Sequence, residues 1–222
     1  FAPGGLRDLL DEHGICLAEI EVIRGLGTDG PGGPGAAEDE LVAFRMADEF
    51  DCRYLQVIGN AGDDVGAAGR AYGALCDRAA DHGLVVGIEF LPFTDITSVV
   101  DARRIVEAAG RDNGGICVDI WHHERGLRDL DAIAALPGEL ITAIQFSDGA
   151  SEPKLGDYYT ECLTNRRPPG HGEFDLVGFL RAVRSTGTTV PIGLEVCSAS
   201  GWADPDSHLA AIAAGMAALP LR

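Results

Sequence analysis

Four short apolar runs in the sequence each end in a side chain whose oxygen atom can bind a metal ion. These side chains are Glu89, Asp119, Gln145 and Glu195. Three carboxylates and one amide form a set of oxygen ligands that suits a hard divalent cation. If the fold brings the four side chains together, the sequence predicts a site for one divalent ion.

The runs themselves indicate how these side chains are positioned. Each is continuously apolar, which is typical of a strand buried on both faces in a parallel α/β sheet. In a closed parallel barrel the C-terminal strand ends surround one mouth, and catalytic groups come from several of those ends. The pattern therefore predicts an enzyme whose site lies at such a mouth. The four runs are residues 85–89, 115–119, 141–145 and 190–195.

The residue two positions before each candidate ligand is small. Side chains two apart on a strand point to the same face, so these residues leave room beneath a metal ion. The alternative is that each polar residue only ends a strand. That alternative requires strand-end position, parity and ligand chemistry to coincide by chance at all four positions. The small residues are Gly87, Cys117, Ala143 and Gly193.

Strand-like and helix-like segments alternate along the whole chain. Six strand-helix units follow a leading helix at residues 6–13, whereas eight strands close the common barrel. We therefore expect one domain over residues 1–222, a TIM (β/α)8 barrel that lacks its first two strands, roughly 40 to 60 residues. A doubly wound sheet would also use parallel strands, but the sequence has no Gly-rich phosphate loop. The remaining strands are expected at 15–23 and 53–59, the remaining helices at 37–50, 64–82, 96–109, 127–136, 174–185 and 206–219, and loops at 25–35 (mobile) and 147–172.

Composition limits the partners and the compartment. A formal net charge of -18 argues against binding nucleic acid, because no basic surface can replace counterions. No apolar run approaches the length of a membrane span, and no cleavable leader is visible. Six cysteines without CxxC pairing are expected to be reduced thiols of a cytoplasmic protein.

Several motifs together resemble a known family. The chain is similar to the sugar phosphate isomerase/epimerase group of xylose isomerase-like TIM barrels, from about Leu6 to the C-terminus. This group includes tagatose and psicose 3-epimerases, inosose dehydratases and bacterial 3-dehydroshikimate dehydratases. The motifs are Gly87-Ile88-Glu89, Asp119-Ile120-Trp121-His122, Gln145-Phe146-Ser147-Asp148, Asn165-Arg166-Arg167-Pro168-Pro169-Gly170-His171-Gly172 and Leu194-Glu195.

The resemblance implies a set of metal ligands. Glu89, Asp119 and Glu195 match the Glu, Asp and Glu that hold one divalent ion in that family. The family's His ligand is Gln145 here. An amide oxygen still binds a hard ion, and the change favours Mn²⁺ or Mg²⁺ (with Co²⁺ also allowed) over Zn²⁺. Gln at this position also looks more like the dehydratase branches than the epimerases.

The resemblance also implies two substrate contacts. His122, three residues after Asp119, matches a substrate-contacting His, and Arg166 matches the Arg that touches substrate oxygens. For His122 the alternative is a supporting or surface position, and for Arg166 a solvated loop position. His123 has no family match and is expected to be structural.

By analogy Glu89 and Glu195 are the catalytic acid/base pair. They would remove a proton next to a carbonyl of a small polyhydroxy substrate, through a metal-stabilised enediolate. The preferred function is thus a metal-dependent sugar isomerase or epimerase, in which a homo-oligomer is allowed. Alternatives are a dehydratase (lyase) of the inosose or 3-dehydroshikimate type and a non-catalytic sugar-binding barrel. An AP endonuclease IV type is disfavoured, because it needs a His-rich zinc cluster and a DNA-binding face.

Three other side chains have two interpretations each. Glu21 either approaches the mouth or lies at its rim, and the rim is the preferred position. Trp202 either walls the pocket or packs within its loop. Asp148 is expected to cap a turn or a helix.

Overall fold

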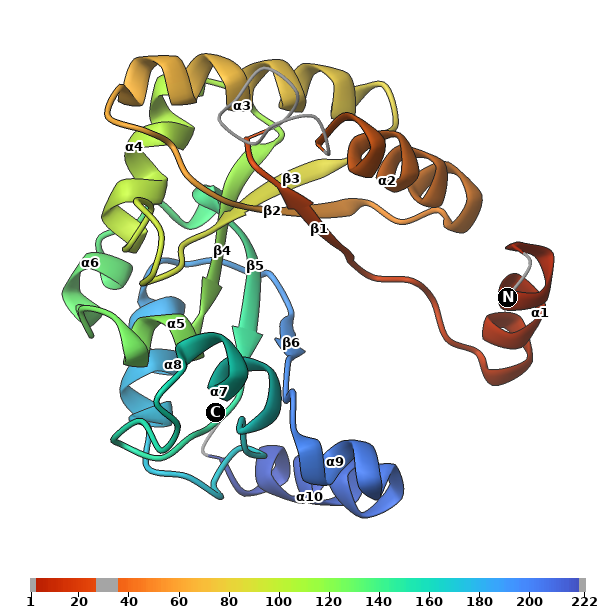
Figure 1. Ribbon diagram of the computed structural model, residues 1–222, viewed down its shortest axis with the longest axis vertical. Helices are drawn as coiled ribbons and strands as arrows, with labels where there is room; N and C mark the ends of the chain where they lie inside the picture. Colours follow the sequence, from red (N-terminus) through yellow and green to blue (C-terminus); the bar gives the residue numbers. More distant parts are fainter. Residues whose placement is uncertain (1–2, 27–35, 220–222) are drawn as a thin grey trace. The chain divides into compact units, whose positions relative to one another are not determined.

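The computed structural model describes residues 3–26 and 36–219. These residues form two compact units, Phe1–Cys117 and Val118–Arg222. Most of the loop predicted to be mobile, namely 27–35, lies outside the described residues. Figure 1 traces the chain in colour, from α1 in red to α10 in blue.

The N-terminal unit is built from strands that alternate with helices. Its strands run parallel, and each pairs with the next strand along the chain. The last two residues of β4 belong to the second unit. The elements are α1 (Pro3–His13), β1 (Ile20–Arg24), α2 (Ala36–Phe50), β2 (Tyr54–Ile58), α3 (Val65–Ala80), β3 (Val85–Glu89), α4 (Val99–Ala109) and β4 (Gly114–Asp119).

A buried tyrosine fixes α3 against two strands of this unit. The Tyr72 hydroxyl donates to the Val86 carbonyl at 2.7 Å and accepts from the Gly115 amide at 3.0 Å. Asp64 caps the start of α3 by accepting from the Ala67 amide. The helix register is therefore set at its first turn and tied to β3 and β4, whose C-terminal ends carry two candidate ligands.

The C-terminal unit pairs two parallel strands, β5 and β6, and contains seven short helical segments among its described residues. Most of its α-helices begin at an Asp or Ser whose side chain accepts a hydrogen bond from the first turn. The elements are α5 (Ile120–Arg125), α6 (Leu130–Ala134), η1 (Gly138–Leu140), β5 (Ile141–Phe146), α7 (Tyr158–Thr164), α8 (Leu176–Ser185), β6 (Ile192–Leu194), α9 (Ala199–Ala203) and α10 (Pro205–Ala218).

The structure corrects several predicted boundaries. The strand expected at 15–23 begins only at Ile20, because Ile15 and Cys16 are exposed and lie outside the sheet. The helix expected at 127–136 shortens to α6. The expected loop 147–172 contains α7, and the segment after β6 contains α9. Asp157 and Ser198 start these two short helices by capping them, whereas their length is too small to give an apolar periodicity.

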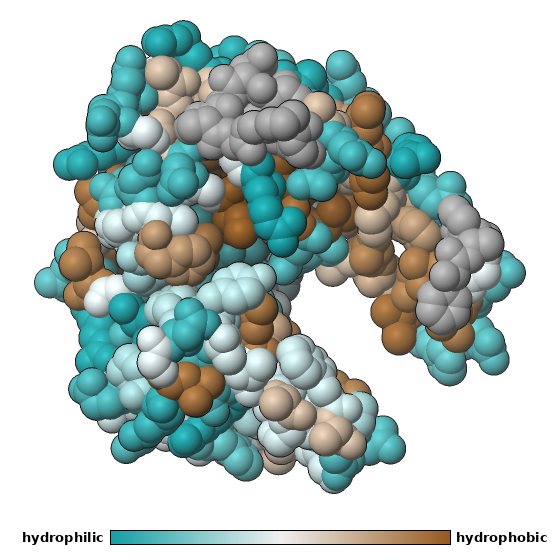
Figure 2. Space-filling model, in the orientation of Figure 1, coloured by the Kyte–Doolittle hydropathy of each residue, from teal (hydrophilic) through white to brown (hydrophobic). Residues whose placement is uncertain are grey.

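Helix α10 is apolar in composition yet mostly exposed. Leu209 is 63% exposed, and Gly215 is the one buried residue of this helix. In Figure 2 much of the α9–α10 region, at the lower right, is pale or brown rather than teal. None of the helices in the described residues combines the length and apolarity needed to cross a bilayer.

Candidate active site

In the N-terminal unit, strand register pairs Glu89, the last residue of β3, with Cys117 of β4. Asp119 is two residues further along β4, so its side chain has the parity of Cys117. Glu89 is 6% exposed, and it accepts a hydrogen bond from the Gln56 amide at 2.9 Å.

A second carboxylate lies near Glu89 in this unit. Burial raises the pKa of Glu19; a hydrogen bond with Glu21 lowers it, and the charge of Glu89 raises it again. Glu21 itself is exposed, in agreement with the preferred rim position. Glu19 therefore lies close enough to Glu89 for the two charges to interact.

In the C-terminal unit, Gln145 and Glu195 share a face. Gln145 pairs in register with Gly193, and Glu195 lies two residues beyond Gly193. The Glu195 amide still donates to the Phe146 carbonyl at 3.2 Å, so the ladder continues one residue past β6. Gln145 is 2% exposed. Both side chains therefore lie at the C-terminal end of the β5–β6 pair.

Arg166 links two of the candidate ligands. Its Nη1 atom lies 2.8 Å from Asp119 Oδ2 and 2.8 Å from Glu195 Oε2. Its Nε donates to the Cys162 carbonyl at 3.1 Å, and Nη2 contacts Cys162 Sγ at 3.2 Å. Burial alone would lower the pKa of Arg166, but Asp119 and Glu195 hold it well above its ordinary value. The guanidinium is thus a fixed buried cation and not a solvated loop group.

His122 lies near the same oxygen of Asp119 that Arg166 contacts. Its Nε2 is 3.4 Å from Asp119 Oδ2, and its Nδ1 is 2.6 Å from the Tyr158 hydroxyl. The side chain is 3% exposed, which excludes the surface position. Asp119, His122, Arg166 and Glu195 therefore meet within hydrogen-bonding range in one unit.

Asp148 shapes the loop that carries Arg166. Its carboxylate accepts from four backbone amides, those of Gly149, Gly170, Gly172 and Phe174, at 2.8 to 3.1 Å. Its backbone also bridges to Arg167. A Cβ on Gly172 would lie 2.2 Å from Asp148 Oδ1, so this position has no room for a side chain. Asp148, which was predicted to cap a turn, therefore binds backbone amides from two distant parts of this loop.

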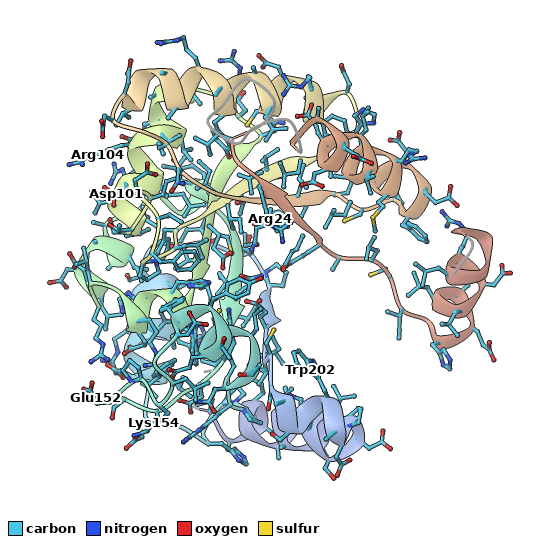
Figure 3. All side chains as sticks on the ribbon, in the orientation of Figure 1. Arg24, Asp101, Arg104, Glu152, Lys154 and Trp202 are labelled. Carbon is cyan, nitrogen blue, oxygen red and sulfur yellow. The ribbon has the colours of Figure 1, made fainter. Side chains whose placement is uncertain are left out.

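Trp202 lines a separate hollow after β6. A cavity of about 370 Å³ lies between α9 and the start of α10. Trp202, labelled in Figure 3, is 66% exposed, and His208 Nε2 lies 3.0 Å from the Val196 carbonyl. The lining residues are Val196, Ser198, Gly201, Trp202, Pro205, His208 and Leu209.

The donor set fits a divalent cation. Asp119 is fully buried and Glu195 is 26% exposed, and both carboxylates already place an oxygen 2.8 Å from one positive nitrogen. One guanidinium balances only one of these two negative charges. A buried excess of carboxylate charge is costly unless a cation offsets it. Related donors are the Gln145 amide and, in the N-terminal unit, Glu89.

His123 is a buried histidine that packs against an aromatic ring. Burial lowers its pKa from 6.5 to about 4, and it packs against Phe179 at 5.9 Å between ring centroids. This agrees with the structural role expected for it.

The pKa of His123 predicts a pH dependence of stability. A neutral buried His stabilises the fold fully above pH 6.5, and this contribution is lost as the pH falls toward 4. Between pH 6.5 and 4 the free energy of unfolding of the wild type should fall by up to about 3 kcal/mol because of His123. His123→Phe should lack this part of the fall. Urea unfolding at both pH values measures it, with His171→Phe on an exposed loop as the control. Equal pH slopes in the wild type and His123→Phe would contradict the expectation.

Two contacts of the site were absent from the sequence analysis. Tyr158 and Cys162 lie on α7, inside the segment expected to be a loop. The available signal was Asp157, a residue type that starts helices, followed by Thr160, whose amide Asp157 caps at 2.8 Å. This signal could have predicted a short helix in the loop. It could not have predicted that the helix contacts His122 and Arg166.

Comparison with known proteins agrees with this architecture. The family described as xylose isomerase-like TIM barrel matches residues 5–219. The solved IOLI protein with a bound zinc atom superposes with a TM-score of 0.80 at 17% identity, covering 97% of this chain and 80% of that one.

Curated relatives match only part of the chain. A 3-dehydroshikimate dehydratase of Pseudomonas aeruginosa is 36% identical over 124 residues, which are 55% of this chain and 19% of the relative. An inosose isomerase of Bacillus velezensis is 27% identical over 124 residues, 55% of this chain and 43% of the relative. The matched segment of the chain thus spans less than half the length of these enzymes. Because the family match covers nearly all of it, this chain belongs to the xylose isomerase-like TIM barrel family.

Proposed function

We propose that this chain is the catalytic part of a divalent-metal-dependent isomerase or epimerase. It removes a proton next to the carbonyl of a small polyhydroxy compound. The observation that supports this most strongly is the position of Arg166, whose Nη1 lies 2.8 Å from both Asp119 and Glu195, with His122 beside Asp119. Carboxylates, a cation and an imidazole within hydrogen-bonding range of one another can transfer a proton and stabilise negative charge, as enolisation of a carbonyl compound needs.

In this proposal Glu89, Asp119, Gln145 and Glu195 hold one divalent ion, with Mn²⁺ or Mg²⁺ preferred. Glu89, Asp119 and the neighbouring His122 are all buried side chains of metal-ligating type. The shared parity of Glu89 with Cys117, and of Gln145 with Gly193, supports the assignment in each unit. A bound divalent ion would supply positive charge for the developing oxyanion of the substrate.

The other proposed roles are acid/base catalysis and substrate binding. Glu89 and Glu195 are the proposed acid/base pair, because each is a carboxylate at a strand end with a defined polar neighbour, Gln56 and Arg166 respectively. Arg166 and His122 bind substrate oxygens and keep the reacting carbon oriented. The burial of Asp119, His122 and Arg166 keeps water from competing for these bonds.

A dehydratase is the second candidate. Its support is the 36% identity to a 3-dehydroshikimate dehydratase, together with Gln145 at the position of the family's His ligand. In a dehydration one carboxylate removes the proton, and an acid protonates the leaving hydroxyl. The same residues serve both reactions, so the product decides between them.

Deuterium incorporation tests the proposal. We expect the Mn²⁺-loaded protein to introduce carbon-bound deuterium from D₂O into at least one member of a panel of ketoses, inososes and 3-dehydroshikimate. Treatment with EDTA should abolish it, and added Mn²⁺ should restore it. An isomerase or epimerase gives a deuterated isomer, whereas a dehydratase releases water and gives an unsaturated product. Turnover that survives EDTA would overturn the metal-dependent mechanism.

The cellular setting follows from the same proposal. All six cysteines are free thiols, which suits the reducing cytoplasm that we propose as the location. The proposed partner is a small polyhydroxy substrate, and self-association into a homo-oligomer remains a prediction.

A further inference from the structure

We propose that Tyr158 is a positioning residue that orients the His122 ring through a hydrogen bond to its Nδ1 atom, and that α7 brings Tyr158 to this contact. The inference rests on the proposed function, because it assigns His122 to substrate binding. Tyr158 is the first residue of α7, in the loop between β5 and α8. Figure 1 shows α7 in teal among the elements of the C-terminal unit.

The two ring nitrogens of His122 have different neighbours. Nε2 faces Asp119 Oδ2 at 3.4 Å, and Nδ1 lies 2.6 Å from the Tyr158 hydroxyl. A carboxylate only accepts hydrogen bonds, so the nitrogen that faces it carries the hydrogen. A neutral imidazole has one N–H, and Nδ1 is then the acceptor of the Tyr158 hydroxyl. The stacked rings, with centroids 6.1 Å apart, hold this arrangement.

This tautomer has a consequence for substrate binding. With the hydrogen on Nε2, His122 presents a donor on the side of Asp119, where a substrate hydroxyl or carbonyl oxygen would lie in the proposed function. Without the Tyr158 hydroxyl, Nδ1 would lose this donor, and the preference for hydrogen on Nε2 would depend on the contact with Asp119. Tyr158 therefore acts through His122 and is not itself a catalytic residue.

Buried contacts hold α7 in the position that this role requires. Glu161 pairs with Arg125 at 3.0 Å, and both side chains are 3% exposed. The other Glu161 oxygen accepts from the amides of Lys154 and Leu155 at 3.0 and 3.1 Å. Arg125 lies over the Trp121 ring at 4.6 Å. This ion pair joins α7 to α5, the helix that carries His122.

The same helix also supports the second substrate contact. Arg166 donates to the Cys162 carbonyl and contacts its sulfur, one turn after Tyr158. One face of α7 thus touches His122 through Tyr158 and Arg166 through Cys162. Helix α7 therefore contacts both side chains that are proposed to bind substrate.

Tyr158→Phe tests the inference, and Tyr159→Phe is its matched control. Tyr159 is the next residue of α7, undergoes the same chemical change, and is 60% exposed. Imidazole ¹⁵N shifts of the metal-free protein at pH 8 report the tautomer, with His122 assigned from the spectrum of His122→Gln. We expect the same His122 spectrum in the wild type and Tyr159→Phe, and a shifted Nδ1 resonance in Tyr158→Phe, because that nitrogen no longer accepts from the Tyr158 hydroxyl. An unchanged His122 spectrum in Tyr158→Phe would overturn the inference.

Kinetics provide the second measurement. On whichever substrate the deuterium assay identifies, kcat/KM of Tyr158→Phe should fall about 10- to 100-fold, the usual effect of losing a residue that orients a site group. Tyr158→Phe should unfold at a lower temperature than Tyr159→Phe, because it removes a hydrogen bond to a buried ring nitrogen, so the kinetics are compared well below both transitions. An equal kinetic loss in Tyr159→Phe would contradict a specific role. If no substrate is turned over, the proposed function fails, while the ¹⁵N spectra still decide the role of Tyr158.

Discussion

Glu195→Gln is expected to lower kcat by about 10²- to 10⁴-fold, the usual contribution of one acid/base group. The substitution keeps the shape of the side chain and removes its charge and its basicity. It also removes one of the two carboxylates beside Arg166, whose Nη1 lies 2.8 Å from Glu195 Oε2. Metal affinity should fall as well, because an amide is a weaker ligand than a carboxylate for Mn²⁺ or Mg²⁺.

The fold should tolerate this change. Glu195 lies one residue beyond β6 and its side chain is 26% exposed, so the amide replaces a half-buried group at a strand end. Glu152→Gln is the matched control, since Glu152 is an exposed carboxylate of the same unit, labelled in Figure 3. The measurements are kcat with saturating Mn²⁺ and Mn²⁺ binding by calorimetry. A Glu195→Gln enzyme that retains more than about a tenth of wild-type kcat would remove Glu195 from the acid/base pair.

The strands near the candidate site could be predicted because continuous apolar runs in the sequence indicate buried strands. Val85–Glu89 and Gly114–Asp119 are apolar runs that end in a carboxylate, and the structure places them as β3 and β4. The amphipathic helix α2, at Ala36–Phe50, was likewise predicted within one residue, whereas α4 begins at Val99, three residues later than expected. Periodicity reports such elements because packing against a core selects every third or fourth side chain.

Short helices and long-range contacts could not be predicted in the same way. Helix α7 has seven residues, too few to display an apolar stripe, and a capping Asp157 starts it. The contact between Tyr158 and His122 joins residues 36 positions apart. The Arg166 ion pair with Asp119 spans 47 positions. No local pattern encodes which distant side chains a loop will meet, so the polar partners of the site required the structure.

Arg166→Met should destabilise the metal-free protein strongly. Removing one partner of a buried ion pair costs about 3 to 5 kcal/mol, since the remaining charge stays buried without compensation. Here Arg166 is 1% exposed and serves both Asp119 and Glu195. It also ties the loop to α7 through the Cys162 carbonyl. The midpoint of urea unfolding should therefore shift far below that of the wild type.

Adding Mn²⁺ should recover more stability in Arg166→Met than in the wild type. Without the guanidinium, Asp119 and Glu195 have no cation between them, so a divalent ion binds a site of higher negative charge and stabilises the fold by linkage. Arg167→Met is the matched control, because the neighbouring arginine is half-buried and its side-chain hydrogen bond to the His171 carbonyl is long, at 3.4 Å. Arg166→Lys keeps the charge and serves if the Met variant does not fold; its metal-free stability should lie between the two. If Arg166→Met unfolds at the urea concentration of Arg167→Met, or if Mn²⁺ stabilises it no more than the wild type, the carboxylates do not depend on Arg166 for charge balance. Their proposed joint role in holding the ion would then lose its electrostatic basis.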